Sequence, residues 1–341
     1  MMRGLVENGS EKQRSHALST MLGSHRLRGQ RDMLGELGAV ALMTPAGVKR
    51  RTIYDAQEDS ALPGKLVLGE GAAKGKDVMV NEAYDFSGVV YDFYSKVFGR
   101  NSVDDRGMRL DSSVHFREDP TEAFDNAFWN GSQMIYGDGD GVTFDRFTKC
   151  LDVIGHELTH GVTQYEAGLA YHGQSGALNE SFSDVFGSLV KQWYKKQTAA
   201  KADWLIGAGL LGKTIKGVAL RSMKAPGTAY DDPHFGGKDP QPATMKGYVK
   251  LSDTQAGDNG GVHINSGIPN HAFYLVAIKL GGFAWERAGK IWYDALCNRI
   301  RSNSTFKTAA QATLASATSL YGSTSPEFKA VKAAWQEVGV L

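Results

Sequence analysis

Cysteine is scarce in this chain of 341 residues, with only Cys150 and Cys297 present. Two thiols are too few for a disulfide framework and too few for a structural zinc site built from cysteines. A single bridge between the two is one alternative, but we expect two buried thiols. The composition therefore excludes the class of small proteins that are held together by disulfides.

Long apolar runs are also missing, since no stretch of 18 consecutive apolar residues occurs. The sequence therefore predicts no helix that spans a membrane. The first 30 residues carry charged and histidine side chains among their apolar positions, which is not the pattern of a signal-peptide core. We expect a protein that acts in the cytoplasm or is secreted by a non-Sec route.

Net charge is nearly absent, at +1 with histidine neutral. Such a chain has no bulk attraction for nucleic acid or for an anionic membrane, so neither is an expected partner. The hydrophobic content of 42% and the charged content of 22% are typical of a soluble globular protein. The length allows about two domains with substantial cores.

A histidine pair on one expected helix indicates metal chemistry. Residues 151–160 read LDVIGHELTH, and apolar residues recur around them at helical spacing without a proline. His156 and His160 are four positions apart, so a helix would direct both imidazoles to one point, as zinc requires. Glu157 could reach a water on that metal without being a ligand. The alternative is that the pair is ordinary polar helix surface.

A second expected helix carries a third ligand. Glu180 lies twenty residues after His160, within NESFSD at 179–184, and apolar residues flank it at helical spacing. Two histidines, one carboxylate and one open position make a catalytic zinc site, because a structural site would be closed by a fourth protein ligand. We therefore predict one catalytic Zn²⁺ held by His156, His160 and Glu180.

HELTH followed by NESFSD resembles the thermolysin-like zinc metallopeptidases, over residues 51–341. Four further stretches carry the resemblance: DNAFWNG (125–131), GDGDG (137–141), ALRSM (219–223) and DNGGVHINSG (258–267). It implies an α+β fold with two lobes, β-rich at the N-terminal side and mainly helical at the C-terminal side, with the active-site helix between them. The N-terminal catalytic lobe would be residues 52–165, including the HExxH helix, and the helical lobe 166–341.

The same resemblance assigns catalytic roles. In this family of zinc endopeptidases a zinc-bound water attacks the peptide bond, and Glu157 would be the general base that passes its proton to the leaving amine. Tyr171 and His263 would stabilise the negative oxygen that the attack creates. Asp258 would orient His263 and favour its charged form. Taken alone, Tyr171 would be a packed aromatic and His263 a surface histidine.

Hydrogen-bond partners behind the metal ligands follow from the resemblance as well. Metal-bound histidines usually donate their second ring N–H to an oxygen. Asp184 would accept this bond from His156, and Asn179 would accept it from His160. Because Asp184 follows Glu180 by four positions, both would project from one face of a helix.

Contacts to the substrate complete what the resemblance implies. Asn126 and Ala127 would pair with the substrate backbone along a strand, and Arg221 would bind the carbonyl just beyond the cut. The pocket for the residue after the cut would be lined by Phe144, Phe147, Val153, Ile206, Leu210 and Leu220. An apolar pocket favours a bulky hydrophobic residue and rejects a charged one.

The chain departs from the family at its paired calcium site behind the active-site helices. Asp152 and Asp203 remain there, but Lys191, Leu205 and Ala208 stand where the family has acids. A hard divalent cation needs six or more oxygen ligands. We therefore do not expect calcium at this double site.

Residues 1–51 hold nine Lys or Arg against four acids and lie outside the catalytic resemblance. They resemble the short prosegment of the protealysin-like members of the family, which folds with its enzyme and inhibits it. A loose basic tail is the alternative. Residues 8–10 predict a turn, and the helix after it would have an apolar face formed by Ala17, Leu18, Met21 and Leu22.

Two kinds of cleavage could remove this prosegment. The enzyme's own apolar pocket would favour cuts before Val40, Leu42, Met43 or Val48. A trypsin-like protease would instead cut at Lys49-Arg50-Arg51. We expect self-processing, because the family pocket should reject arginine.

Periodicity predicts the remaining secondary structure. In the N-terminal lobe we expect a helix at 85–98, strands at 114–116, 127–129 and 133–136, and a tight turn at 137–141 rather than a calcium loop. In the C-terminal lobe we expect helices at 270–279, 285–299 and 326–338, with Gly- and Pro-rich loops at 213–265.

Two rival interpretations remain. An aminopeptidase of the gluzincin class, which trims single residues, would need an acidic anchor for the substrate's amino terminus, and residues 126–129 offer none. A zinc-binding module without catalysis is the other rival. Because Glu157, Tyr171 and His263 are all present, the sequence favours an active peptidase.

Overall fold

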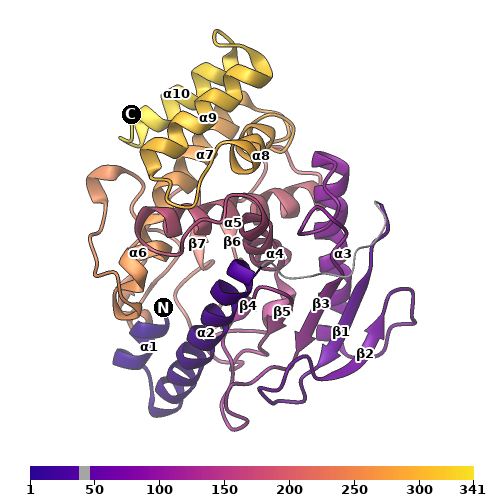
Figure 1. Ribbon diagram of the computed structural model, residues 1–341. Helices are drawn as coiled ribbons and strands as arrows, with labels where there is room; N and C mark the ends of the chain where they lie inside the picture. Colours follow the sequence, from indigo (N-terminus) through magenta and orange to yellow (C-terminus); the bar gives the residue numbers. More distant parts are fainter. Residues whose placement is uncertain (38–46) are drawn as a thin grey trace. The chain divides into compact units, whose positions relative to one another are not determined.

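The computed structural model of the chain describes residues 1–37 and 47–341 (Figure 1). Three of the expected processing positions, Val40, Leu42 and Met43, lie outside the described residues. Contacts divide the chain into two compact units. The first unit comprises Met1–Gly161, Gly207–Leu220 and Tyr230–Lys238, and the second comprises Val162–Ile206, Arg221–Ala229 and Asp239–Leu341.

The first unit contains a five-stranded mixed sheet in the order β2-β1-β3-β5-β4 (Figure 1). Its strands are β1 (Arg51–Asp55), β2 (Lys65–Gly69), β3 (Leu110–Val114), β4 (Ala127–Trp129) and β5 (Met134–Tyr136). β1, β3 and β5 run parallel, and the outer strands β2 and β4 are antiparallel to their neighbours. β4 and β5 lie where they were expected. The strand expected at 114–116 is instead β3, which ends before His115, because that residue has a φ of 55° and leaves the extended conformation.

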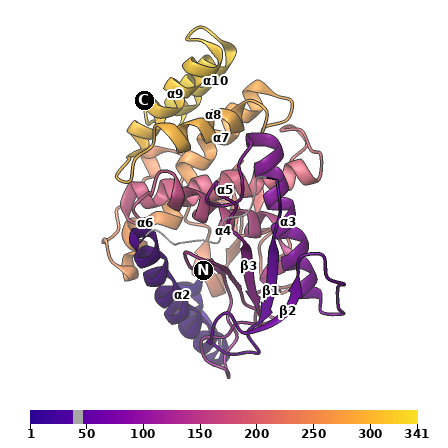
Figure 2. The same cartoon turned by 45° about the vertical axis from the view of Figure 1, so that its right-hand side comes forward.

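Helix α3 (Val78–Phe98) packs on β1 and β3 (Figure 2). It begins seven residues before the expected start at Asp85. The reason is Asp77, whose carboxylate accepts two backbone N–H groups of the first turn and so caps the helix. The helix ends at Gly99, where a φ of 72° demands the left-handed conformation that glycine adopts without strain.

His115 links the start of α3 to the loop at residues 137–141. Its Nε2 lies 2.8 Å from Asp77, and its Nδ1 lies 2.9 Å from Asp138. The hydrogen bond to Asp138, supported by the one to Asp77, raises the pKa of His115 to about 9 against the opposing effect of burial. The imidazolium is therefore present at neutral pH and holds the two carboxylates together.

We expect this cluster to make stability depend on pH. Because folding raises the pKa of His115 from 6.5 to about 9, its contribution is fully present below pH 6.5 and is lost as the pH rises through about 9. His115→Gln should therefore lower the melting temperature by roughly a few degrees at pH 6 and change it little at pH 10. Melting curves test this, with the exposed His25 replaced by Gln as the control. Equal losses at both pH values would contradict the expectation.

Within the first unit the N-terminal residues form two helices, α1 (Met2–Asn8) and α2 (Glu11–Leu37) (Figure 1). The turn between them lies where it was expected. The expected apolar face of the second helix is wrong, because Leu18 and Leu22 are 49% and 67% exposed, although Ala17 is buried. The face that α2 buries is largely polar, so periodicity of apolar residues could not find it.

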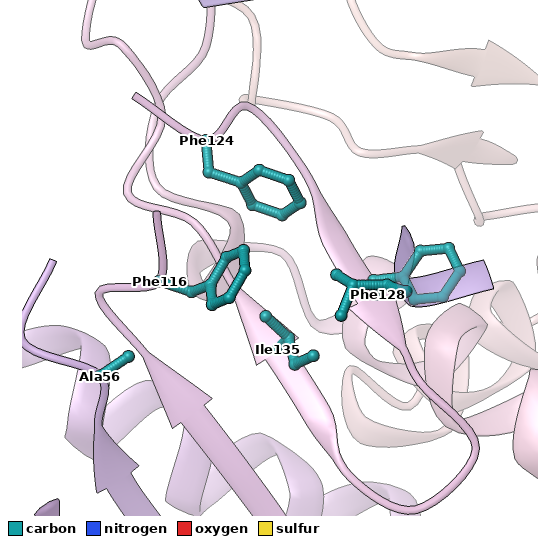
Figure 3. Close-up of a cluster of buried hydrophobic side chains, with 6 residues drawn as sticks. Ala56, Phe116, Phe124, Phe128 and Ile135 are labelled. Carbon is teal, nitrogen blue, oxygen red and sulfur yellow. The ribbon is translucent and has the colours of Figure 1, made fainter. Parts of the chain in front are cut away.

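A large apolar side chain, Leu27, is also buried on that face. Leu27 is fully buried in a core cluster. The members of this cluster that Figure 3 labels are Ala56, Phe116, Phe124, Phe128 and Ile135. Burial of one leucine side chain contributes about 1.5–3 kcal/mol. Around it, side chains of the helix contact acids elsewhere in the first unit. Arg26 binds both oxygens of Glu118, with Nε 2.9 Å from Oε1 and Nη2 2.7 Å from Oε2, and His16 lies 2.6 Å from Glu122.

Short elements and most of the HExxH helix complete the first unit. They are η1 (Phe147–Lys149), α4 (Leu151–Tyr165), β8 (Asp231–Asp232), η2 (Pro233–Phe235) and β9 (Gly237–Lys238). Every residue of α4 from 151 to 163 is buried. At 137–141 the chain makes the expected turn, in which one oxygen of Asp140 accepts the backbone N–H groups of residues 142–144.

The second unit is mainly helical, as expected. Its elements are α5 (Gly173–Tyr194), β6 (Leu205–Ile206), β7 (Arg221–Ser222), η3 (Met245–Gly247), η4 (Gln255–Gly257), α6 (Asp258–Asn265), α7 (Gly267–Leu280), α8 (Ala288–Asn298), α9 (Phe306–Tyr321) and α10 (Pro326–Glu337). The helices expected at 270–279, 285–299 and 326–338 are α7, α8 and α10. Periodicity missed α9, whose buried face consists mostly of alanine and therefore gives a weak apolar pattern.

Cys150 is a buried thiol, as expected, whereas Cys297 is a thiol that is only partly buried. None of the helices in residues 1–37 and 47–341 combines the length and the hydropathy that a membrane span requires.

Candidate active site

Two imidazoles converge on α4. His156 and His160 are each 4% exposed, and their Nε2 atoms lie 3.1 Å apart with the ring planes at 86°. Two nitrogens that bind one tetrahedral zinc at about 2.0–2.1 Å would lie roughly 3.3 Å apart. The helix therefore places both rings in the geometry that a shared metal ion requires.

Glu180, on α5, completes a group of three ligands. One ligand atom from each of His156, His160 and Glu180 lies within 4.8 Å of the other two, and all three residues are buried. Two imidazole nitrogens and one carboxylate oxygen are the donor set of catalytic zinc sites. A carboxylate that is only 1% exposed also fits a bound cation, which would offset the cost of burying its charge. The three residues form a metal-binding triad.

Glu157 lies beside this triad. Its Oε1 is 3.9 Å from Nε2 of His156, and its side chain is 11% exposed. Its Oε2 accepts the backbone N–H of Trp129, on β4, at 3.1 Å. The backbone of Trp129 therefore orients the carboxylate of Glu157.

Tyr171, His263 and Asp258 form a connected group at Glu180. The Tyr171 hydroxyl donates to Oε1 of Glu180 and lies 3.1 Å from Nε2 of His263. Nδ1 of His263 lies 2.5 Å from Asp258, which also accepts the His263 backbone N–H at 2.9 Å. Four successive residues with positive φ, 258–261, turn the chain so that this carboxylate meets the ring. Asp258 thus fixes both the ring and the backbone of His263.

Asp184, on α5, is a fully buried carboxylate held by three donated hydrogen bonds. Arg221, on β7, donates from Nε at 2.8 Å and from Nη2 at 2.7 Å. Asn270, on α7, donates from Nδ2 at 2.8 Å. The sequence had not singled out Asn270, because no local pattern distinguishes it from other polar helix positions. Asn179, the other expected partner of a metal ligand, donates its Nδ2 to the carbonyl of Leu169 at 3.1 Å.

The residues expected to meet the substrate backbone contact helix α2 or each other. Nδ2 of Asn126 donates to Oγ of Ser24, on α2, at 2.9 Å. The backbone N–H of Ala127 donates to Oδ1 of Asn126 at 3.0 Å. Both donors are therefore engaged within this chain, and α2 lies against β4.

Most residues of the expected pocket are buried. Phe144, Phe147, Val153, Ile206 and Leu210 are buried, and Leu220 is partly exposed. The rings of Phe144 and Phe147 have centroids 5.8 Å apart. The carbonyl of Leu210 accepts the backbone N–H of Asp145 at 2.8 Å, next to Phe144. Within the first unit the structure thus brings Phe144, Phe147 and Leu210 together. Their shared role as a pocket stays a prediction.

Lys191 stands at a position where the resemblance to the family led us to expect an acid. Its buried ammonium donates to the carbonyl of Leu205 at 2.6 Å and pairs with Asp203 at 2.9 Å. Asp152 is also buried, and its two oxygens accept the backbone N–H groups of Val153 and Gly207. Among the described residues, His156, His160 and Glu180 are the one group of three such side chains that converges for a metal.

We expect the protein to be insensitive to calcium removal. The ammonium of Lys191 already pairs with Asp203, so a calcium ion there would be repelled by that ammonium and would have to displace it from the carboxylate. A calcium-selective chelator should change the melting temperature little while zinc stays bound. A drop of more than about 10 °C, equivalent to a few kcal/mol at this size, would reveal a calcium site elsewhere.

A buried His-His-Glu triad with a glutamate beside it on an HExxH helix defines a metallopeptidase. Family comparison agrees: residues 47–164 match the thermolysin metallopeptidase catalytic domain, and residues 167–340 match the thermolysin metallopeptidase alpha-helical domain. The chain belongs to the thermolysin family of metallopeptidases.

Individual relatives agree with this family assignment. An extracellular metalloprotease of Pectobacterium carotovorum subsp. carotovorum is 48% identical over 348 residues, covering 100% of this chain and 94% of the relative. Thermolysin of Alicyclobacillus acidocaldarius subsp. acidocaldarius is 41% identical over 84% of this chain and 50% of its own length. The structure of the precursor of protealysin, a metalloproteinase from Serratia proteamaculans, superposes with a TM-score of 0.88 at 52% identity, covering 100% of this chain and 97% of that one.

Proposed function

We propose that the chain is the latent precursor of a zinc endopeptidase that cuts peptide bonds on the N-terminal side of bulky hydrophobic residues. The observation that carries the proposal is the convergence of His156, His160 and Glu180, with ligand atoms within 4.8 Å of one another, beside the carboxylate of Glu157. The family uses zinc, and the donor set fits it.

Zinc at the triad would polarise the scissile carbonyl and lower the pKa of the attacking water. In this proposal Glu157 takes the proton from that water and delivers it to the leaving amine. Its hydrogen bond from Trp129 keeps one oxygen in place during both transfers. Tyr171, once its hydroxyl turns from Glu180 to the substrate, and His263 would donate hydrogen bonds to the oxygen that becomes negative, and Asp258 holds His263 in position for this.

The remaining site residues would support these roles. Asp184 and Asn179 would hold the two histidine ligands in orientation. Arg221 would contact the substrate carbonyl beyond the cut, while its pairing with Asp184 keeps the guanidinium in place. Asn126 and Ala127 would bind the substrate backbone once the prosegment has left.

Latency would come from the prosegment, residues 1–51 in this proposal, which precedes lobes at 52–165 and 166–341. Ser24 holds the side chain of Asn126, a residue that the substrate would need. Leu27 and the pair of Arg26 with Glu118 hold α2 against the first unit. The relative that is a precursor structure supports the same arrangement.

Processing would occur before the last residues of this segment. Arg51 is the first residue of β1 and binds Glu70, so a cut after it would fall within the sheet. Lys49 pairs with Asp92 at 2.7 Å. Val48, by contrast, is exposed, which makes a cut before it accessible to the enzyme's own pocket. We propose export of the protein as well, because the relative from Pectobacterium carotovorum is named as an extracellular enzyme.

Hydrolysis of casein tests the proposed function. The processed protein should cut casein, a zinc chelator should abolish the activity, and added zinc should restore it. The unprocessed precursor should be much less active. Chelator-resistant hydrolysis, or equal activity before and after processing, would contradict the proposal. Release of single amino acids only would favour the aminopeptidase alternative.

Specificity gives a sharper expectation. Peptides with Leu, Phe, Ile or Val just after the scissile bond should be cut best, because the pocket of Phe144, Phe147 and Leu210 gains apolar contact with them. Peptides with Asp or Glu there should be cut at least about a hundredfold more slowly, since the pocket offers no partner for a buried charge. Values of kcat/KM for a matched peptide series check this. A preference for acidic residues would show that the pocket assignment is wrong.

A further inference from the structure

We infer that Phe235, in the hairpin Tyr230–Lys238, is a positioning residue for the pocket that receives the substrate residue after the cut. The inference rests on the proposed function, because it concerns the wall of the pocket proposed there. The sequence had given no role to this hairpin, which contributes β8, η2 and β9 to the first unit.

The evidence begins with a row of aromatic rings. Phe235 stacks on Phe144, with ring centroids 5.8 Å apart and planes at 21°. Phe144 in turn lies against Phe147 at 5.8 Å. Tyr230 packs edge-on against Phe235 at 5.2 Å, with planes at 80°. Two members of this row are pocket residues, and Phe235 supports the first of them along its face.

The hairpin fixes the position of Phe235 through its backbone. Asp232 is 1% exposed, and its carboxylate accepts the backbone N–H groups of His234 at 2.8 Å and Lys216 at 2.7 Å. Gly236, with a φ of 84°, then reverses the chain, and β8 pairs with β9. The ring of Phe235 is therefore presented by a braced turn, so it can hold Phe144 in one orientation.

In the precursor, helix α1 of the prosegment contacts the same turn. Helix α1 packs on η2, and Gly4 lies so close that a Cβ there would be 2.2 Å from the carbonyl carbon of Phe235. Only glycine permits that approach. When α1 has gone, the ring is held by Phe144, Tyr230 and its own turn, so the mature enzyme is the form in which its effect on the pocket can be measured.

Loss of this ring should affect large substrate side chains selectively. Without Phe235 the ring of Phe144 can tilt, and the pocket wall makes less contact with a bulky residue. A small residue such as alanine does not reach the wall far enough to lose contact. A change in general stability would instead reduce activity on all substrates alike.

The test uses the processed, zinc-loaded enzyme and two peptides that differ only in Leu or Ala after the scissile bond. We expect Phe235→Ala to lower the ratio of kcat/KM for the Leu peptide over the Ala peptide by about tenfold. The value for the Ala peptide should stay within about threefold of wild type. Phe235→Tyr, which keeps the ring, should keep the wild-type ratio. Phe98→Ala, which truncates an aromatic of α3 that packs against Phe93, serves as the control and should leave the ratio unchanged.

The outcomes are distinct. A wild-type preference for Leu that Phe235→Ala retains in full would overturn the inference while leaving the proposed function intact. A wild-type enzyme without any preference for Leu would instead overturn the proposed pocket. If Phe235→Ala does not fold, Phe235→Leu replaces it, and an unchanged ratio in that variant overturns the inference equally.

Discussion

Glu157→Ala should lose nearly all peptidase activity while keeping its zinc. The lost step is proton transfer from water to the leaving amine, and removal of a general base typically costs about 10²–10⁴-fold. Metal content should stay at one zinc per chain, because the ligand atoms belong to His156, His160 and Glu180. The measurements are casein hydrolysis and metal analysis on the same preparation.

This variant also tests self-processing. Purified alone, the Glu157→Ala precursor should remain full length, whereas wild type should shorten to a start before Lys49. A zinc-free Glu157→Ala protein would place Glu157 among the ligands and overturn its assignment as base. N-terminal sequencing that shows a clean start at Thr52 in both proteins would mean that another protease activates the enzyme.

The second large effect concerns the carboxylate ligand. Glu180→Gln should weaken zinc binding by more than about a hundredfold. Loss of a residue that only hydrogen-bonds to a metal ligand already lowers metal affinity by up to about a hundredfold, and Glu180 is itself a ligand. A neutral amide is a poorer ligand than a carboxylate, and the substitution preserves the shape of the side chain. Competition with a chromogenic chelator measures the change in affinity.

Glu157→Ala is the matched control for that experiment, because it removes a neighbouring carboxylate that is not a ligand. The control should hold zinc as tightly as wild type, within about threefold. Stoichiometric zinc of wild-type affinity in Glu180→Gln would contradict the triad, whatever the variant's activity. Loss of activity alone would not decide the matter, because Tyr171 also donates to Glu180.

Local chemistry accounts for the parts of this protein that the sequence predicted well. His156 and His160 converge because a helix places positions four apart on one face, and that geometry needs no tertiary contact. The turn at 137–141 and the helices α7, α8 and α10 likewise follow from short-range patterns. Helix α3 is present as expected, but it begins earlier than the apolar pattern predicted, because its capping residue Asp77 lies outside that pattern.

By itself, then, the sequence determined the metal ligands, the α+β class and the likeness to a family whose motifs occur in order along the chain. Only the tertiary structure decided which face of α2 is buried, because His16, Thr20 and Ser24 make polar contacts that no apolar periodicity records. It also decided that Asn270 meets Asp184, 86 positions away, and that Phe235 stacks on Phe144. Such pairs depend on how distant segments pack, and each partner alone looks like an ordinary polar or apolar residue.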